Sequence, residues 1–430
     1  MDAFNPGIYD PEEVRTLVED AQEINANALI VQVGRRFDCF CNEALFPRTD
    51  AAIDPAPYDP LAEVVEQAHA AGIEVHAWVN ATTLWNSATP PESPEHAFNQ
   101  HGLEAEGSDR WLNKRVDGTE LVGDSSYLDP ANPDAVDYVV DGVRSLLAEY
   151  DLDGINLDYI YLGMYDVDPQ ARLSINGITY DFGPQTHGGW EQTRPYTDVL
   201  QDWKAWLAEG IIDTNVAMNY KRDWMDDQAQ MFDEWNEALA NWQYDRQTVN
   251  GPGIFLNGIS ESVRQARETF EPTETGNTMV GWSGYAYASP SLDAGEQPGG
   301  ADAERERLAH ALTEEDPDGN EPLFEQDAAV PSMPWKEQPS NGHVNVQVGL
   351  RSGSPLDGAQ VSLQRPGSEQ STVTTQVTDG SGWAGFVDVA PGRWKVVLER
   401  PDDVLGPPVS IVTVEAGTIT DVELDRLRRR

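Results

Sequence analysis

The stretch PLAEVVEQAHAAGIEVHAWVN, residues 60–80, decides the fold. Residues 60–71 have the apolar spacing of a helix, and residues 72–80 alternate as a strand does. The same order recurs on both sides of this stretch. Further strands are expected at residues 28–33, 154–160, 172–180, 213–220, 253–257 (the end of one) and 279–286. Further helices are expected at residues 12–24, 133–150, 197–209, 225–242, 261–271 and 302–312. Strands that alternate with helices are typical of parallel βα units.

The number of βα units favours one α/β architecture. Seven strands over about 300 residues, with no glycine-rich phosphate loop after the first strand, favour a (β/α)₈ TIM barrel over a doubly wound sheet. Residues 1–315 are expected to form the barrel. Residues 316–341 are acidic and rich in Pro and Gly, which predicts a wrap and linker. Residues 342–430 contain short alternating strands between Gly and Pro turns, which predicts a small all-β sandwich.

The composition is strongly acidic. The 430 residues include 28 Lys and Arg against 74 Asp and Glu, a formal net charge of −46. Such a charge argues against binding nucleic acid or anionic membranes, because both carry negative charge. Lys is scarce, since Arg makes up most of the basic residues. This surface is typical of a halophilic protein, because molar salt shortens the Debye length to about 3 Å. An acidic protein from ordinary salt is the alternative.

The two cysteines and the apolar runs say little about function. Cys39 and Cys41 are separated by one residue, so a disulfide between them is expected to be strained, and buried free thiols are expected instead. Two thiols do not make a zinc site, and no HxH or HExxH spacing exists, so no metal or other cofactor is expected. No apolar run reaches 18 residues, so no membrane span is expected. The start of the chain shows no signal peptide.

Strand alternation predicts which side chains enter the barrel. Helices cover the outside of a barrel, so the aliphatic residues of each strand are expected to face outward and the residues between them inward. The residues expected inside are Gln32, then His76, Trp78 and Asn80, then Asn156 and Asp158, and finally Asn215, Ala217 and Asn219. Several of them lie near the C-terminal ends of strands, where barrel enzymes hold their active sites.

Asp158 is the strongest candidate for a functional residue. It is a carboxylate at the end of the apolar strand GINLDYI, flanked by Tyr159 and Tyr161. A charge at this position is costly unless it is used or paired. The alternative is that Asp158 caps a loop or pairs with Arg35 or Arg36.

Aromatic residues gather in the same loops. They are Trp78, Trp85, Trp111, Tyr159, Tyr161, Trp190, Tyr220, Trp224, Trp282 and Tyr285. Aromatic faces stack on sugar rings, and paired carboxylates hydrolyse glycosidic bonds. A single Trp is more often a core residue, and His76 alone is more often a hydrogen-bonded core residue. The combination of aromatic residues with Asn and Asp at strand ends indicates a carbohydrate site.

These residues lie in stretches that resemble the glycoside-hydrolase-like family 10 proteins, formerly DUF187. The matching stretches between residues 2 and about 290 are FNPGIYDPEEV, NALIVQVGRRFDCFCNEALFPRT, YDPLAEVVEQAHAAGIEVHAWVN, LDPANPDAVDYVVDGV, YDLDGINLDYI and QDWKAWLAEGIIDTNVAMNYKRD. The resemblance implies a TIM barrel with glycoside-hydrolase activity, in a family whose characterised members act on peptidoglycan glycan chains. It implies that Asp158 is the central acidic residue. Residues 355–401 resemble the carboxypeptidase-regulatory-like sandwich, which suggests an adhesion or spacing module.

The sequence departs from the family pattern at two places. Met1 stands where the family's first strand should end, so that strand and an export signal are expected to be lost from this chain. About ten residues, 162–171, join the LDYI strand to the next strand, where the family has a helix. Despite the absent signal, the family and the sandwich favour an extracellular or cell-surface location.

The expected reaction is the hydrolysis of O-glycosidic bonds in a polysaccharide or cell-surface glycan. Asp158 would be the nucleophile or stabilising charge. Asp223 is the first choice for the residue that transfers the proton, and Asp181 and Glu191 are the alternatives. Asp223 has the alternative of being a solvated surface acid. The expected sugar-binding residues are His76, Trp78, Asn80, Tyr159, Tyr161, Asn219, Tyr220, Arg35 and Trp282. A non-catalytic carbohydrate-binding protein with a degenerate barrel is the second hypothesis, and an intracellular metabolic enzyme is the third.

Overall fold

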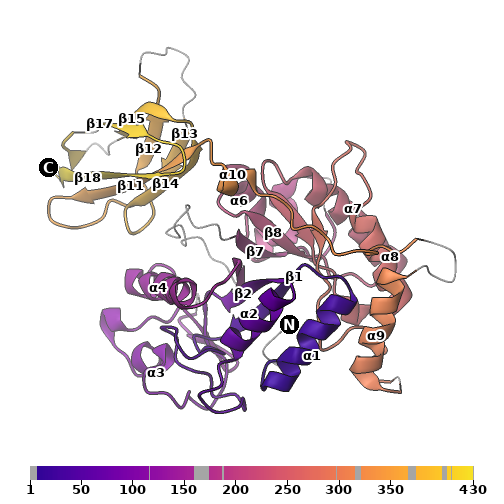
Figure 1. Ribbon diagram of the computed structural model, residues 1–430. Helices are drawn as coiled ribbons and strands as arrows, with labels where there is room; N and C mark the ends of the chain where they lie inside the picture. The colour runs from indigo at the N-terminus through magenta and orange to yellow at the C-terminus, as the bar shows by residue number, and fades with distance from the viewer. Residues whose placement is uncertain are drawn as a thin grey trace. The chain divides into compact units, whose positions relative to one another are not determined.

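The computed structural model describes residues 7–115, 117–158, 174–185, 188–296, 298–314, 321–366, 374–399, 404–407 and 409–429 (Figure 1). The chain divides into two compact units. The first unit consists of residues up to Pro331. The second unit consists of residues from Ser332 onward, and residues 209–211 group with it. Tyr159 and Tyr161, and the short connection at residues 162–171, lie outside the described residues.

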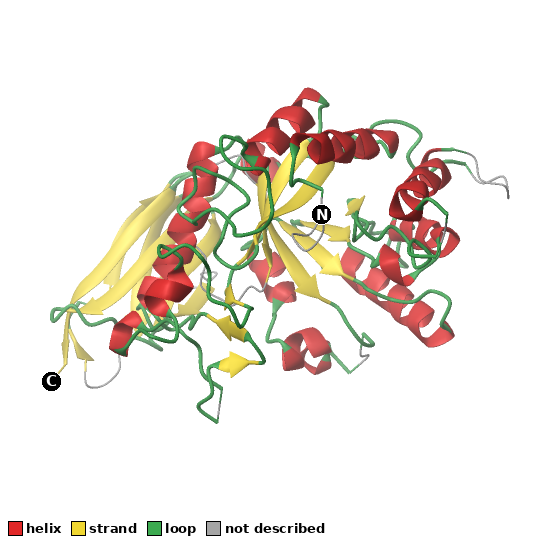
Figure 2. Cartoon of the chain, turned by 90° about the horizontal axis from the view of Figure 1, so that it is seen from below, coloured by secondary structure: helices red, strands yellow, loops and turns green. Residues whose placement is uncertain are grey.

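A curled parallel sheet forms the centre of the first unit (Figure 2). Within the described residues it holds seven strands in chain order: β1 (Ala28–Gly34), β2 (Glu74–Asn80), β6 (Gly154–Asp158), β7 (Ser174–Tyr180), β8 (Thr214–Met218), β9 (Gln247–Asn250) and β10 (Gly281–Trp282). In the described part of the chain β1 and β10 are the two edges, so the sheet is a half barrel. The predicted α/β barrel-type fold, followed by an all-β domain, is confirmed.

The helices between these strands begin where the sequence provides a cap. Asp10, Asp59 and Asn132 each accept hydrogen bonds from backbone N–H groups of the first turn, and each is followed by Pro at the first helical position. Such caps stabilise a helix by about 1 kcal/mol. The helices are α1 (Pro11–Glu23), α2 (Pro60–Ala70), α3 (Ala97–His101), α4 (Pro133–Glu149), α5 (Arg194–Asp198), α6 (Trp203–Glu209), α7 (Asp226–Asn241), α8 (Ile259–Thr269) and α9 (Gly300–Thr313). Among the described residues, none of the helices combines the length and apolar character that a membrane span requires.

The predicted strand end at residues 253–257 is wrong. These residues form the single helical turn η3 (Ile254–Leu256), and the strand is β9, which ends earlier at Asn250. The chain leaves the sheet at Gly251 and Pro252, because proline has no N–H for a sheet ladder. A small antiparallel sheet also stands between β2 and α4, made of β3 (Thr83–Trp85), β4 (Leu121–Val122) and β5 (Ser125–Tyr127).

The second unit is a β-sandwich that follows the short helix α10 (Pro334–Glu337). One sheet has the order β14 (Trp383–Val389), β11 (Gly342–Leu350), β18 (Ile419–Arg429) and β16 (Val404–Leu405), and the other has the order β13 (Thr374–Val377), β12 (Gln360–Gln364), β15 (Gly392–Glu399) and β17 (Val409–Val414). Val346 and Val361, one from each sheet, lie in the same fully buried core. β18 pairs parallel to β11, and most of its exposed positions are charged.

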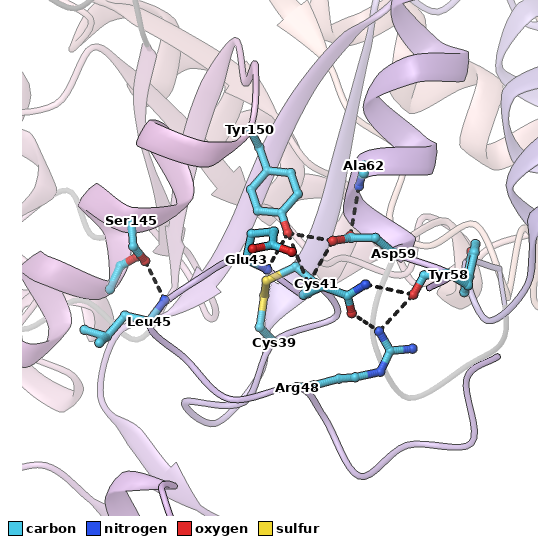
Figure 3. The surroundings of a disulfide bond; sticks show 12 residues. Cys39, Cys41, Glu43, Leu45, Arg48, Tyr58, Asp59, Ala62, Ser145 and Tyr150 are labelled. Carbon is cyan, nitrogen blue, oxygen red and sulfur yellow. Dashed lines mark hydrogen bonds between the residues drawn. A yellow bond between two sulfur atoms is a disulfide. The ribbon is translucent and has the colours of Figure 1, made fainter. Parts of the chain in front are cut away.

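The expectation of free thiols is also wrong. Cys39 and Cys41 form a disulfide (Figure 3), and their Cα atoms are 5.0 Å apart, within the range that the bond spans. The chain makes a tight turn here instead of an extended segment. The N–H of Phe40 donates to the carbonyl of Val33 at 2.9 Å, and the N–H of Cys39 donates to that of Pro47 at 2.8 Å. These backbone bonds hold the two cysteines close enough to join.

Candidate functional site

A row of polar and aromatic residues lines the hollow side of the sheet. Gln32 of β1 is paired laterally with Trp78 of β2, Trp78 with Asn156 of β6, and Asn156 with Asn176 of β7. Laterally paired residues of parallel strands point to the same face of the sheet. The ring of Trp78 also contacts the ring of Tyr285, which follows β10 at the opposite edge, at 6.2 Å between centroids. This row therefore faces the inside of the half barrel, as predicted for β1, β2 and β6.

His76 is held on the inner face because its neighbour on β6, Gly154, has no side chain. The side chain of Asn176 lies 2.8 Å from His76 Nδ1, although Gly154 of β6 stands between the two strands. A Cβ atom at Gly154 would lie 2.2 Å from the same nitrogen. The absence of a side chain at Gly154 therefore lets the imidazole reach over β6.

We expect Gly154→Ala to displace the His76 ring and to lower the free energy of unfolding by about 1–3 kcal/mol, the usual cost of overpacking a filled interior. Chemical denaturation measures this loss. Gly276→Ala is a control for the loss of glycine alone, because nothing lies within 4 Å of its Cβ position, although its positive φ adds some strain. Equal stability of Gly154→Ala and wild type would contradict the proposed packing.

Asp158 lies at the C-terminal end of β6 beside Asn80. The two residues are lateral partners, and the N–H of Ala81 donates to the Asp158 carbonyl at 2.8 Å. Asn80 is fixed by three hydrogen bonds: its Oδ1 accepts from Trp78 Nε1 at 3.0 Å and from Gln32 Nε2 at 3.2 Å, and its Nδ2 donates to the carbonyl of Arg35 at 2.9 Å. The Asp158 side chain is half-buried, so it retains contact with solvent.

Aromatic rings continue from Trp78 across the strand ends of β8, β9 and β10. Tyr285 stacks on Tyr220 with ring centroids 5.5 Å apart and planes at 10°. Phe255 of η3 packs edge-on against both rings, and Phe182 lies 5.4 Å from Tyr220. Trp78, Tyr220 and Tyr285 were predicted from the sequence to belong to the aromatic group, whereas Phe255 and Phe182 were not. Their positions directly after strands were the available signal.

The predicted orientation of β8 is wrong. Thr214 is paired with Asn176 and Val216 with Ile178, so Thr214 and Val216 share the inner face. Asn215 instead accepts a hydrogen bond from Thr179, and Asn219 donates to Asn236 of α7. The prediction assumed that the aliphatic residues of every strand face the helices. Here the helix layer supplies polar partners, so the Asn residues lie on the outer side.

Asp181 is buried in this outer layer and has no exposed surface. Its Oδ2 lies 3.3 Å from the Thr179 hydroxyl, and its carbonyl accepts a 2.7 Å hydrogen bond from Lys221 Nζ. Burial raises the pKa of Asp181, which the Lys221 charge partly offsets, and burial lowers the pKa of Lys221. A carboxylate enclosed in this way does not reach the hollow of the sheet.

The other two candidate proton donors lie on the connections that follow β7 and β8. Asp223 is buried and forms an ion pair with Arg264 of α8. Glu191 is exposed on the helical turn η2 (Trp190–Gln192), next to Trp190, which packs on Trp203 and Trp242.

Trp282, a predicted sugar-binding residue, is placed on the helix-covered side. It packs with the cluster that contains Val263 of α8 and Leu308 of α9, and its ring lies 6.1 Å from that of Phe324. Two of the predicted residues, Tyr159 and Tyr161, lie outside the described residues.

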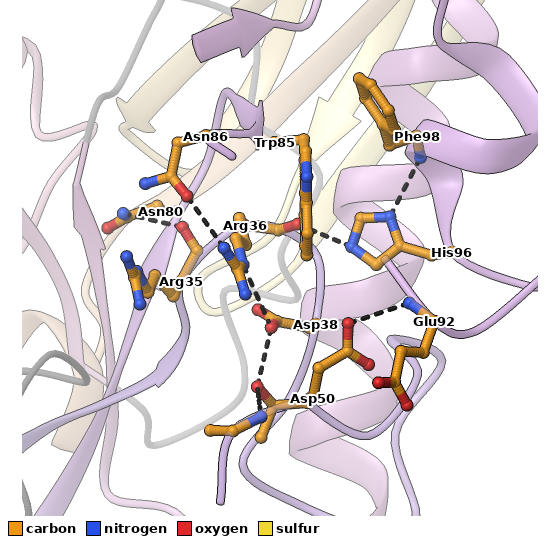
Figure 4. A network of polar contacts seen from close by, with 12 residues as sticks. Arg35, Arg36, Asp38, Asp50, Asn80, Trp85, Asn86, Glu92, His96 and Phe98 are labelled. Atoms are coloured by element: carbon orange, nitrogen blue, oxygen red, sulfur yellow. Dashed lines mark hydrogen bonds and ion pairs between the residues drawn. The ribbon is translucent and has the colours of Figure 1, made fainter. Parts of the chain in front are cut away.

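A second polar network stands after β1 (Figure 4). The Arg36 guanidinium lies over the Trp85 ring at 3.6 Å from the centroid, donates to Asn86 at 3.1 Å, and pairs with the buried Asp38 at 3.4 Å. His96 Nε2 is 3.0 Å from the Arg36 carbonyl, and burial lowers the pKa of His96. A neutral His96 therefore holds the chain beside Arg35, which the sequence analysis had placed in the site.

Within the described part of the chain, no group of three or more His, Cys, Asp or Glu side chains is arranged to hold a metal ion.

The first unit is thus a parallel half barrel with a row of polar and aromatic residues on its inner face. Residues 3–172 match the glycosyl hydrolase-like 10 family, which confirms the resemblance to this family. The glycosyl hydrolase YngK of Bacillus subtilis is 30% identical over 254 residues, which is 47% of this chain and 47% of that protein. The glycosyl hydrolase DigH of Escherichia coli K12 is 28% identical over 126 residues, which is 29% of this chain and 27% of that protein. The chain thus matches less than half the length of either relative.

A solved structure to which the chain is similar is the PgaB (BpsB) glycoside hydrolase domain from Bordetella bronchiseptica. The similarity covers 69% of this chain and 95% of that domain, with 14% sequence identity and a TM-score of 0.46.

Proposed function

We propose that this protein hydrolyses O-glycosidic bonds of a polysaccharide or cell-surface glycan, with Asp158 as the central carboxylate. The observation that carries the proposal is the half-buried Asp158 at the end of β6, directly beside the fixed Asn80. The family match at residues 3–172 supports the same reaction class. A carboxylate at this end of a parallel strand has the position from which barrel enzymes act.

The inner row supports sugar binding at the same place. Trp78, Tyr285 and Tyr220 supply aromatic faces, and Asn80 and His76 supply polar groups within the same hollow. Apolar ring faces with a few fixed polar groups are typical of carbohydrate sites. Asp223 remains our first choice for the second carboxylate, since its loop follows β8. Asp223 has to leave its ion pair with Arg264 in order to contact the substrate. The distance between the carboxyl groups of Asp223 and Asp158 then decides whether the configuration of the anomeric carbon is retained or inverted.

The test is the release of reducing ends from a panel of polysaccharides by wild type and Asp158→Asn, in molar KCl. The panel contains peptidoglycan glycan strands, chitin, cellulose and starch fragments. Hydrolysis by wild type that is lost in Asp158→Asn supports the proposal. The anomeric configuration of the first product, measured by NMR, then distinguishes retention from inversion.

A non-catalytic sugar-binding protein is the second candidate. It is favoured by the placement of Asp181, which is fully buried in the outer layer, and of Asp223, which pairs with Arg264. Oligosaccharide binding without the release of reducing ends identifies this function.

We also propose an extracellular or cell-surface location. The Cys39–Cys41 disulfide supports it, because disulfides persist in oxidising compartments. The expected result is that antibody labels intact host cells or detects the protein in the medium, and that mass spectrometry of the native protein finds the two cysteines linked. Detection only after lysis, with both thiols reduced, contradicts the proposal.

A further inference from the structure

Trp224 differs from every other tryptophan of the chain. All 13 Trp residues lie in the described part of the structure, and Trp224 alone is exposed, with 56% of its surface open to solvent. An exposed indole forfeits the burial free energy that a Trp side chain normally gains in a core. An exposed Trp side chain is therefore a candidate for contact with a ligand.

The exposed ring is held in one orientation. Trp224 lies in the loop between β8 and α7, and its Nε1 donates to the carbonyl of Leu256 at 3.1 Å. Leu256 belongs to η3, which follows β9, so the indole bridges two neighbouring loops at the C-terminal ends of the strands. Fixing the indole in advance lowers the entropy cost of stacking a ligand on it.

The loop that carries Trp224 is itself rigid. Asn257 is fully buried, its Oδ1 accepts from the N–H of Asp223 at 2.8 Å, and its Nδ2 donates to the carbonyl of Lys221 at 2.9 Å. The buried Gln265 donates to the same carbonyl at 3.3 Å. The residues that precede Trp224 are thus attached to Asn257 and to Gln265 of α8, which supports the loop that carries the indole.

Trp224 is connected to the same loops as the inner aromatic rings. Trp78 contacts Tyr285, and Tyr285 contacts Tyr220 and Phe255. Phe255 directly precedes Leu256, the partner of Trp224. Trp78 is 8% exposed and Trp224 is 56% exposed, so the buried and the exposed aromatic faces lie on neighbouring strand-end loops.

We propose that Trp224 is an outer sugar subsite, on which a pyranose ring stacks one or more residues away from the bond that is cut. This inference rests on the proposed function and adds to it the place where a sugar beyond the two at the cleaved bond binds. A stacking platform at a distance from the reacting centre gains affinity for long chains and leaves the reaction of short ones unchanged.

The test compares wild type, Trp224→Ala and Trp224→Phe for binding of chitin, cellulose and starch oligosaccharides of two to six sugars, in molar KCl. We expect Trp224→Ala to bind hexasaccharides about 5- to 10-fold more weakly and disaccharides equally well, since an aromatic stacking contact has this strength. Trp224→Phe should recover most of the affinity. Tyr244→Ala is the matched control: Tyr244 is 51% exposed but precedes β9, at the opposite end of the strands.

The outcomes separate the two proposals. If wild type binds or cleaves none of these oligosaccharides nor glycan strands from peptidoglycan, the proposed function fails, and the subsite with it. If wild type binds hexasaccharides and Trp224→Ala binds them equally well, the subsite is wrong while the proposed function stands. An equal loss for disaccharides and hexasaccharides also overturns an outer subsite.

Discussion

Asp158→Asn is expected to lower the kcat for glycan hydrolysis by about 10³-fold or more, with little change in the affinity for substrate. The substitution keeps the shape of the side chain and its place beside Asn80, but removes the charge. A neutral amide neither attacks the anomeric carbon nor stabilises an oxocarbenium-like transition state. The loss should therefore fall on kcat, while oligosaccharide binding measured by calorimetry stays within a few-fold of wild type.

A matched control uses the other end of the same strand. Asp151 precedes β6, and its side chain is 94% exposed, so Asp151→Asn also removes one negative charge next to β6 but at the end away from the site. It should retain the activity of wild type. If Asp158→Asn is as active as Asp151→Asn, Asp158 does not catalyse the reaction. Thermal unfolding of both variants guards against a loss of activity through misfolding.

The order of strands and helices could be predicted from the sequence because apolar residues recur with a different spacing in helices and in strands, and because capping residues mark the helix starts. The position of Asp158 followed from the same pattern, since an apolar strand that ends in a carboxylate is unusual. Which face of β8 points inward could not be predicted in this way. That choice depends on partners distant in sequence, such as Asn236 of α7 for Asn219.

The disulfide and the candidate proton donors show the same limit. The Cys39–Cys41 bond depends on a turn that Val33 and Pro47 fix through backbone hydrogen bonds. Asp223 looks like a free acid in the sequence, but it meets Arg264, which lies 41 positions later on α8. Local spacing predicts local structure, and these contacts are made between elements that the chain brings together only when it folds.

Transfer from molar KCl to dilute buffer is expected to lower the melting temperature of the first unit by more than about 10 °C, which corresponds to several kcal/mol for a unit of this size. Residues 1–331 hold 62 of the 74 Asp and Glu but 18 of the 28 Lys and Arg. Their carboxylates already crowd one another. Burial and the neighbouring charge of Asp233 raise the pKa of Glu268 to about 7. Dilution lengthens the Debye length from about 3 Å to about 30 Å, so repulsion that molar salt screens acts across the whole unit.

The sandwich provides an internal control for this salt effect. Residues 332–430 hold 12 Asp and Glu and 10 Lys and Arg, so their net charge is close to zero. Scanning calorimetry at several KCl concentrations should show a transition of the first unit that moves with salt and a transition of the sandwich that moves little. Equal movement of both transitions would show that the salt effect does not arise from the charge of the first unit. A melting temperature that is independent of KCl would contradict the halophilic interpretation. It would also make dilute buffer suitable for the hydrolysis assay, because inactivity there would no longer be explained by unfolding.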